Sequence, residues 1–73
     1  MKVERAYKID GKFIERGMII KVFTIDEIAK QGRFLDVIDF LGQKVMKLDC
    51  SDKYVSSIVE LNVAEIEYFE IVY

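Results

Sequence analysis

Three aspartates lie close together in residues 34–49, which read FLDVIDFLGQKVMKLD. Clustered carboxylates can share a proton as an acid–base pair, or they can ligate a cation. Whether Asp36, Asp39 and Asp49 do either depends on the elements that carry them.

A hairpin that turns at residues 42–43 sets Asp36 directly opposite Asp49. Lys47 is then the diagonal neighbour on the same face and can bridge the two carboxylates. Asp39 falls on the core side near the hairpin end, where it can reach solvent. Because a calcium site needs six or more oxygens, we expect a solvated face and no metal site.

Residues 34–41 also fit a helix, with Arg33, Asp36, Asp39 and Gln43 on one side. Gly42 at the first central position of a two-residue loop is typical of a type II′ hairpin. The apolar run after it is too short for a second helix. We favour the hairpin, and an α+β fold with residues 34–41 helical is the alternative.

Other catalytic signals are missing from the chain. It contains no histidine, and therefore lacks the commonest general base and the ordinary zinc ligand sets. No phosphate-binding loop or nucleophile elbow occurs. Cys50 falls on the apolar face of the expected hairpin, which predicts a buried structural thiol. The sequence predicts a protein that is not an enzyme and has no cofactor.

The composition predicts one small folded domain over residues 1–73. Hydrophobic residues make up 52% of the 73 residues and charged residues 33%, which excludes intrinsic disorder. The charged N-terminus has no apolar core of a secretory signal, and one cysteine fits a reducing compartment. We therefore expect a cytoplasmic protein without a membrane segment.

The N-terminal region predicts a hairpin, because Asp10-Gly11 separates two strand-like runs. We expect strands near 3–9 and 12–23. Pairing outward from the turn sets Tyr7 opposite Ile14 and Arg5 opposite Arg16.

The next segment predicts a short helix over 24–32. Thr24 and Glu27 have the spacing of a capping box, and Gly32 provides a left-handed stop. After the central hairpin we expect strands near 54–61 and 67–73, joined by a single helical turn at 62–66.

This order of elements predicts a mainly β fold with one short α-helix, arranged as a small antiparallel barrel or roll. From Met18 onward it resembles the SH3-like and Sm-like small barrels in element order, with an extra hairpin at the N-terminus. The resemblance implies binding of peptides, nucleic acid or further copies of the chain, and leaves the function open.

Basic residues gather in the first half of the chain. Residues 1–33 carry eight Lys/Arg and five Asp/Glu, whereas residues 34–73 carry three and eight. Arg5 and Arg16 face each other in the expected hairpin and would bind a phosphate between them, with Tyr7 and Phe13 as stacking surfaces for bases. This pattern gives a candidate nucleic-acid patch made of Arg5, Lys8, Lys12, Arg16 and Lys21.

Large apolar side chains remain after one face of each strand is assigned to the core. Such surplus usually forms an interface. The candidate partner interface consists of Phe23, Phe34, Ile38, Phe40, Tyr68 and Val72. The last strand also reads as an edge that could accept another strand. We therefore expect a small interaction module that self-associates or binds a protein partner, with a nucleic-acid-associated accessory protein as the alternative.

Overall fold

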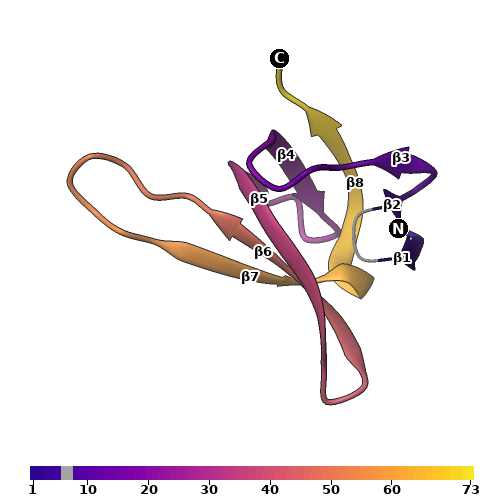
Figure 1. Ribbon diagram of the computed structural model, residues 1–73. Coiled ribbons are helices and arrows are strands. Elements are labelled where there is room, and N and C mark those ends of the chain that lie inside the picture. Colours follow the sequence, from indigo (N-terminus) through magenta and orange to yellow (C-terminus); the bar gives the residue numbers. More distant parts are fainter. Residues whose placement is uncertain (6–7) are drawn as a thin grey trace.

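Two antiparallel sheets make up the computed structural model, which describes residues 1–5 and 8–73 (Figure 1). The first sheet has the order β1-β2-β3, with β1 at Val3–Arg5, β2 at Lys8–Ile9 and β3 at Lys12–Phe13. The second has the order β7-β6-β5-β4-β8. Its strands are β4 (Ile19–Thr24), β5 (Ala29–Phe40), β6 (Gln43–Asp49), β7 (Ile58–Asn62) and β8 (Ile66–Ile71).

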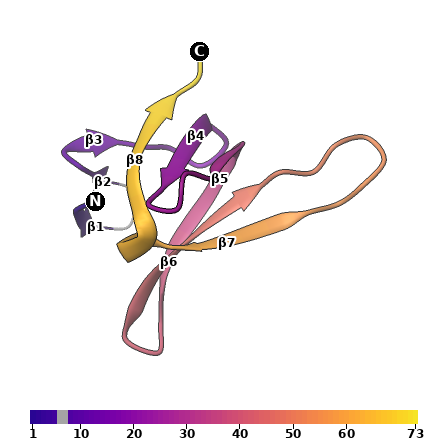
Figure 2. The ribbon, with the colours of Figure 1, turned by 180° about the vertical axis from the view of Figure 1, so that it is seen from behind.

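The mainly β prediction is confirmed, but neither sheet closes into a barrel and the described residues contain no α-helix. One 3₁₀ turn, η1 (Val63–Glu65), carries the chain from β7 to β8 (Figure 2). The Asn62 side chain accepts the N–H of Ala64 at 3.0 Å and so caps η1. The single helical turn expected at 62–66 is confirmed. The strand expected from residue 54 is too long, since β7 begins at Ile58.

The N-terminal hairpin turns where the sequence predicts. Asp10 and Gly11 have φ angles of 51° and 76°, as a type I′ turn requires. In place of one strand over 3–9, however, β1 and β2 pair with each other, with Arg5 in register with Lys8. The expected pairing of Arg5 with Arg16 is therefore wrong. The expected partner of Ile14, Tyr7, lies outside the described residues.

The expected strand over 12–23 is also wrong, since it is interrupted between β3 and β4. Gly17 has a φ of 99° there, and the chain turns at this point. Beyond the interruption the expected alternation holds: Ile20 and Val22 are buried, while Lys21 faces away from the core.

The helix expected over 24–32 is wrong, because these residues form the turn between β4 and β5 and the start of β5. The Thr24 hydroxyl accepts the N–H of Ile28 at 3.2 Å, so it caps a turn. Glu27 has a φ of 65°, which ends any helix. A two-turn helix has little stability of its own. Pairing residues 29–33 with β4 satisfies the backbone groups of both strands instead.

The central hairpin is confirmed, and the α+β alternative with residues 34–41 helical is wrong. The turn lies one residue earlier than expected, at Leu41 and Gly42, with φ angles of 51° and 78°. This shift changes every pair in the hairpin, so that Asp36 faces Lys47 and Asp39 faces Lys44.

A β-bulge in β5 decides which residues reach the core. The register shifts between Phe34 and Asp36, which leaves Leu35 as an extra residue in β5. Phe34 and Val37 are consequently both buried, although strict alternation would put them on opposite faces. Phe34 is 0% exposed, so its assignment to a partner interface is wrong.

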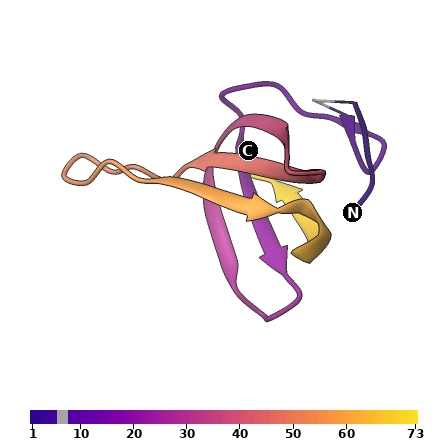
Figure 3. The same ribbon diagram turned by 90° about the horizontal axis from the view of Figure 1, so that it is seen from below.

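The core lies between the N-terminal region and one face of the five-stranded sheet. Ile9 and Ile14 bring the N-terminal region into it. Most of the remaining buried residues come from the five-stranded sheet. They are Ile20, Val22, Phe34, Val37, Met46, Leu48, Ile66 and Phe69, with Val63 from η1. Figure 3 shows the long β6–β7 connection extending away from this body.

We expect Gly32→Ala to lower the free energy of unfolding by about 1–3 kcal/mol, the usual cost of overpacking. Gly32 is buried in β5, and a Cβ there would lie 2.8 Å from the Asp49 carbonyl oxygen and 2.8 Å from the Cys50 sulfur. Urea denaturation measures the change, and Gln31→Ala on the exposed face of β5 is the control. Adding Cys50→Ala should not restore stability, since the carbonyl oxygen remains; full restoration would contradict the contact.

Candidate interaction surfaces

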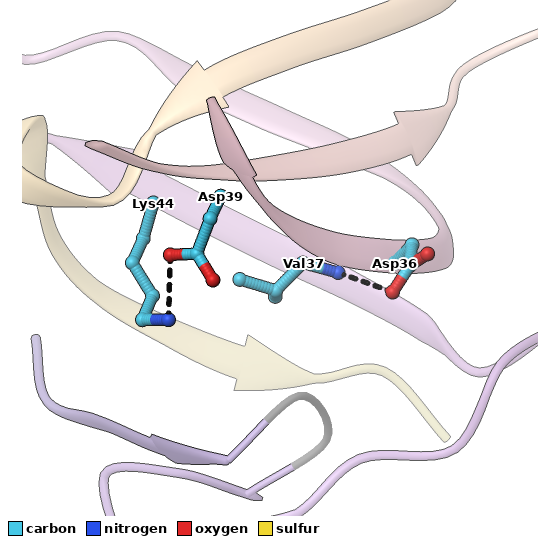
Figure 4. A network of polar contacts seen from close by, with 4 residues as sticks. All are labelled: Asp36, Val37, Asp39 and Lys44. Atoms are coloured by element: carbon cyan, nitrogen blue, oxygen red, sulfur yellow. Dashed lines mark hydrogen bonds and ion pairs between the residues drawn. The ribbon is translucent and has the colours of Figure 1, made fainter. Parts of the chain in front are cut away.

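The three aspartates of the central hairpin have separate structural roles, and Figure 4 shows two of them, Asp36 and Asp39. Asp36 accepts the N–H of Val37 at 2.8 Å, beside the bulge. Asp39 binds the Lys44 ammonium at 2.8 Å and is mostly exposed, as expected near the hairpin end. Asp49 accepts the N–H of Ser51 at 2.9 Å. In the described part of the chain, no group of three or more metal-ligating side chains occurs.

The expected pair of Asp36 and Asp49 is wrong, because the turn lies one residue earlier than the sequence suggested. Asp49 faces Arg33, and Asp36 faces Lys47. Lys47 does not bridge two carboxylates of the hairpin; its ammonium lies 3.8 Å from the Glu60 carboxylate of β7. These contacts offer no shared proton and no cation cage.

Hydrogen bonds hold the β6–β7 connection, residues 50–57, at its base and at its tip. At its base the Cys50 N–H donates to the Ser57 carbonyl at 2.9 Å, and the Ser57 N–H donates to the Ser51 hydroxyl at 2.8 Å. At its tip the Asp52 carboxylate accepts the N–H groups of Tyr54 and Val55. Tyr54 is thereby presented to solvent and is 83% exposed.

Hydrogen bonds lower the pKa of two carboxyls at this connection. The bonds from Tyr54 and Val55 hold the pKa of Asp52 below its ordinary 3.8. Hydrogen bonds from Ser51 lower the pKa of Asp49, and Arg33 adds a smaller effect in the same direction. Both shifts favour the ionised carboxylates that hold the connection in place.

The basic residues of the candidate nucleic-acid patch do not share one surface. Lys8 pairs with Glu4 at 3.3 Å, and the Lys8 ammonium lies 5.2 Å from the centre of the Phe13 ring. Lys12 lies over the ring of the buried Phe69, at 5.3 Å, and so on the core side of β8. Lys21 points to the opposite side of the sheet.

Arg16 is exposed in the turn that ends at Gly17, before the start of β4, the strand that carries Lys21. Arg5 is described by its backbone alone, in register with Lys8. The expected facing pair of arginines therefore does not form.

The candidate partner interface divides into two groups on the outer face of the five-stranded sheet. Phe23 and Tyr68 are cross-strand neighbours on β4 and β8, with stacked rings 4.4 Å apart. Val72 follows on the same side, its N–H bonded to the Ile19 carbonyl. Ile38 and Phe40 lie at the far end of β5.

The second group borders a hollow of about 290 Å³ on the outer face of β5, β6 and β7. Its lining consists of Ile38, Phe40, Val45, Lys47 and Glu60. Val45, Lys47 and Glu60 were not assigned to an interface from the sequence. The β5–β6 register sets Val45 opposite Ile38, and the β6–β7 register adds Glu60 opposite Lys47.

Two further hollows lie away from the outer face of β5, β6 and β7. One, of about 330 Å³, lies where the N-terminus meets the β5–β6 turn and η1, and is lined by residues 1, 3, 42–44 and 62–64. The other, of about 370 Å³, lies along β8 and is lined by Lys12, Phe69, Glu70, Ile71 and Tyr73. The prediction that the last strand is a sheet edge is confirmed, since β8 is the outer strand beside β4.

We expect the β6–β7 connection to loosen at low pH. Because folding lowers the pKa of Asp52, its stabilisation is present above the ordinary value of 3.8 and is lost as the pH falls through the lower folded value. The amide shifts of Tyr54 and Val55, followed by NMR from about pH 6 to pH 2, should change with a midpoint below 3.8.

In Asp52→Ala, these two amides should have at neutral pH the chemical shifts that they have in the natural chain at low pH. Asp39→Ala, which removes a carboxyl beside the β5–β6 turn, should leave them unchanged. A midpoint at or above the ordinary pKa would contradict the hydrogen-bonded tip.

No helix in the described ranges 1–5 and 8–73 is long and apolar enough to cross a membrane. Comparison of the chain with models of protein families, with curated proteins and with solved structures finds no match.

Proposed function

We propose that this chain is a non-enzymatic interaction module that self-associates through the outer face of β5, β6 and β7. The observation that carries the proposal is the apolar hollow on that face. Phe40, Ile38 and Val45 line the hollow, and Phe40 is 59% exposed. Side chains of this size are seldom left together in water unless another surface covers them.

A second copy of the chain is the occupant that the charges favour. Lys47 and Glu60 lie side by side at the rim, so the lining of the hollow carries one charge of each sign. In a two-fold contact the same patch is used twice, and Lys47 of each copy then meets Glu60 of the other. The patch is therefore complementary to itself in charge as well as in apolar surface.

The size of the domain also supports association. A chain of 73 residues buries a smaller fraction of its surface than larger domains, and it has neither a disulfide partner for Cys50 nor a histidine for a structural metal site. Covering Phe40 and Ile38 with a second copy adds buried apolar area at about 25 cal/mol per Å² before the cost of association.

Sedimentation velocity at increasing protein concentration should show a monomer–dimer equilibrium. Phe40→Glu should abolish the dimer, because it places a carboxylate in the centre of the contact. Tyr54→Glu, which adds the same charge at an exposed aromatic on the β6–β7 connection, is the matched control and should leave the dimer intact.

Exchanging the charges of Lys47 and Glu60 tests the same contact in a second way. Lys47→Glu and Glu60→Lys should each weaken the dimer, and the double variant should restore it. A chain that stays monomeric at high micromolar concentration would contradict self-association and would leave a foreign protein as the partner of this face.

A nucleic-acid partner is the second candidate, favoured by the exposed ring of Phe13 beside the Lys8 ammonium. The geometry gives it less support, since Lys8 is already paired with Glu4 and Lys12 and Lys21 lie on opposite sides of the sheet. Titration with a single-stranded oligonucleotide at two salt concentrations tests it, because phosphate binding must weaken as salt rises. Lack of binding at low salt removes this candidate.

We also propose that the fold is an open variant of the SH3-like or Sm-like barrels. The support is the sheet order β7-β6-β5-β4-β8, the long bulged β5 and the 3₁₀ turn before the last strand. A solution structure with a different strand order would contradict it. The single cysteine supports a reducing compartment, the cytoplasm, and cell fractionation tests that placement.

A further inference from the structure

The edge of β8 carries backbone groups that point away from the sheet. β8 is the outer strand, and its described ladder runs to β4 alone. The N–H of Val72 donates to the Ile19 carbonyl at 2.9 Å. Because successive residues of a strand direct their backbone groups to opposite sides, those of Phe69 and Ile71 point outward.

A hollow of about 370 Å³ runs beside this edge. Phe69 and Ile71 line it from β8, and Lys12 lines it from β3 in the N-terminal sheet. The Lys12 ammonium reaches across to the Phe69 ring. The outward backbone groups thus lie beside an open space that is bounded by a cation. An exposed sheet edge of this kind can accept an added strand.

Two charges lie at this edge, Lys12 on the core side and Glu70 on the outer side, where Glu70 is in register with Lys21 of β4. Among the described residues, none of the ion pairs includes Lys12 or Glu70. Lys12 is on the core side of β8, over Phe69, whereas Glu70 alternates with Phe69 and Ile71 and is on the outer side. A strand added here would meet a positive charge on one face and a negative charge on the other.

We propose that the β8 edge binds an extended peptide segment of a protein partner by antiparallel strand addition. Read from its N-terminus, the segment carries an apolar residue opposite Ile71, a basic residue opposite Glu70 and an acidic residue opposite Phe69. The apolar and acidic side chains lie on the core side, in the hollow, where the acidic one meets Lys12. The basic side chain lies on the outer face.

A second copy of β8 fits this edge poorly. Pairing the outward groups of Phe69 with those of Ile71 in a two-fold partner sets the two Glu70 carboxylates directly opposite each other. Like charges at directly opposed positions are destabilising. The unpaired Lys12 would also gain no carboxylate from that register, so a foreign segment is the occupant that the charges favour.

This site is separate from the dimer face proposed above, which lies on β5, β6 and β7. Peptide binding is therefore expected to persist in the monomeric Phe40→Glu variant. A result that contradicts one of the two proposals therefore does not contradict the other.

The probe is a blocked peptide with the sequence Ser-Thr-Val-Lys-Glu-Thr-Ser, titrated into the full chain and followed by NMR of the protein amides. We expect the amides of Phe69 and Ile71 to shift and to become protected from hydrogen exchange. Lys12→Glu should weaken binding about tenfold, since it opposes two carboxylates. Lys53→Glu, the same charge change on the β6–β7 connection, should have no effect.

Two changes in the peptide keep the test independent of any effect on folding. Replacing the glutamate by lysine should lower affinity for the natural chain and raise it for Lys12→Glu. Methylating the backbone nitrogens of valine and glutamate removes donors of the added ladder and should abolish binding. Absence of shifts at millimolar peptide, or binding that tolerates both Lys12→Glu and N-methylation, overturns the proposal.

Discussion

The fold depends on the single extra residue in β5. β5 is the longest strand, and it pairs with β4 along its first half and with β6 along the rest. Leu35 shifts the alternation between these halves, so that Phe34 and Val37 can both enter the core. Without that shift, one half of β5 would turn its apolar side outward. The bulge also bends the strand, which lets one sheet wrap around the core without closing.

Features encoded by neighbouring residues were predictable from the sequence. The Asp10-Gly11 turn, the central hairpin and the turn at η1 each depend on a few adjacent side chains. The helix over 24–32 was wrong although its capping signal is local, because pairing with β4 outweighs a two-turn helix. Asp36 and Asp49 were misplaced because the turn of the central hairpin lies one residue earlier than expected. Arg5 and Arg16 were misplaced because Arg5 is in register with Lys8 of β2 and β3 ends at Phe13, before Arg16.

The candidate site was only partly predictable for the same reason. Phe40 and Ile38 were recognised as surplus apolar residues, but Phe34 was grouped with them because a bulge leaves no mark in the alternation of the sequence. The aspartates that first suggested chemistry instead fix turns and a connection, at 2.8–2.9 Å from their partners. Asp36 and Asp49 each accept a backbone N–H and Asp39 binds the Lys44 ammonium, so each carboxylate is held by a different partner.

The position of β8 has a consequence for how the chain folds. The strands β4 to β7 follow one another and pair as neighbours, whereas Ile20 pairs with Ile71 across most of the sequence. Closing such a long loop costs more entropy than forming a hairpin. β4 therefore keeps an open edge until β8 arrives, and this late pairing sets the folding rate more than any local turn does.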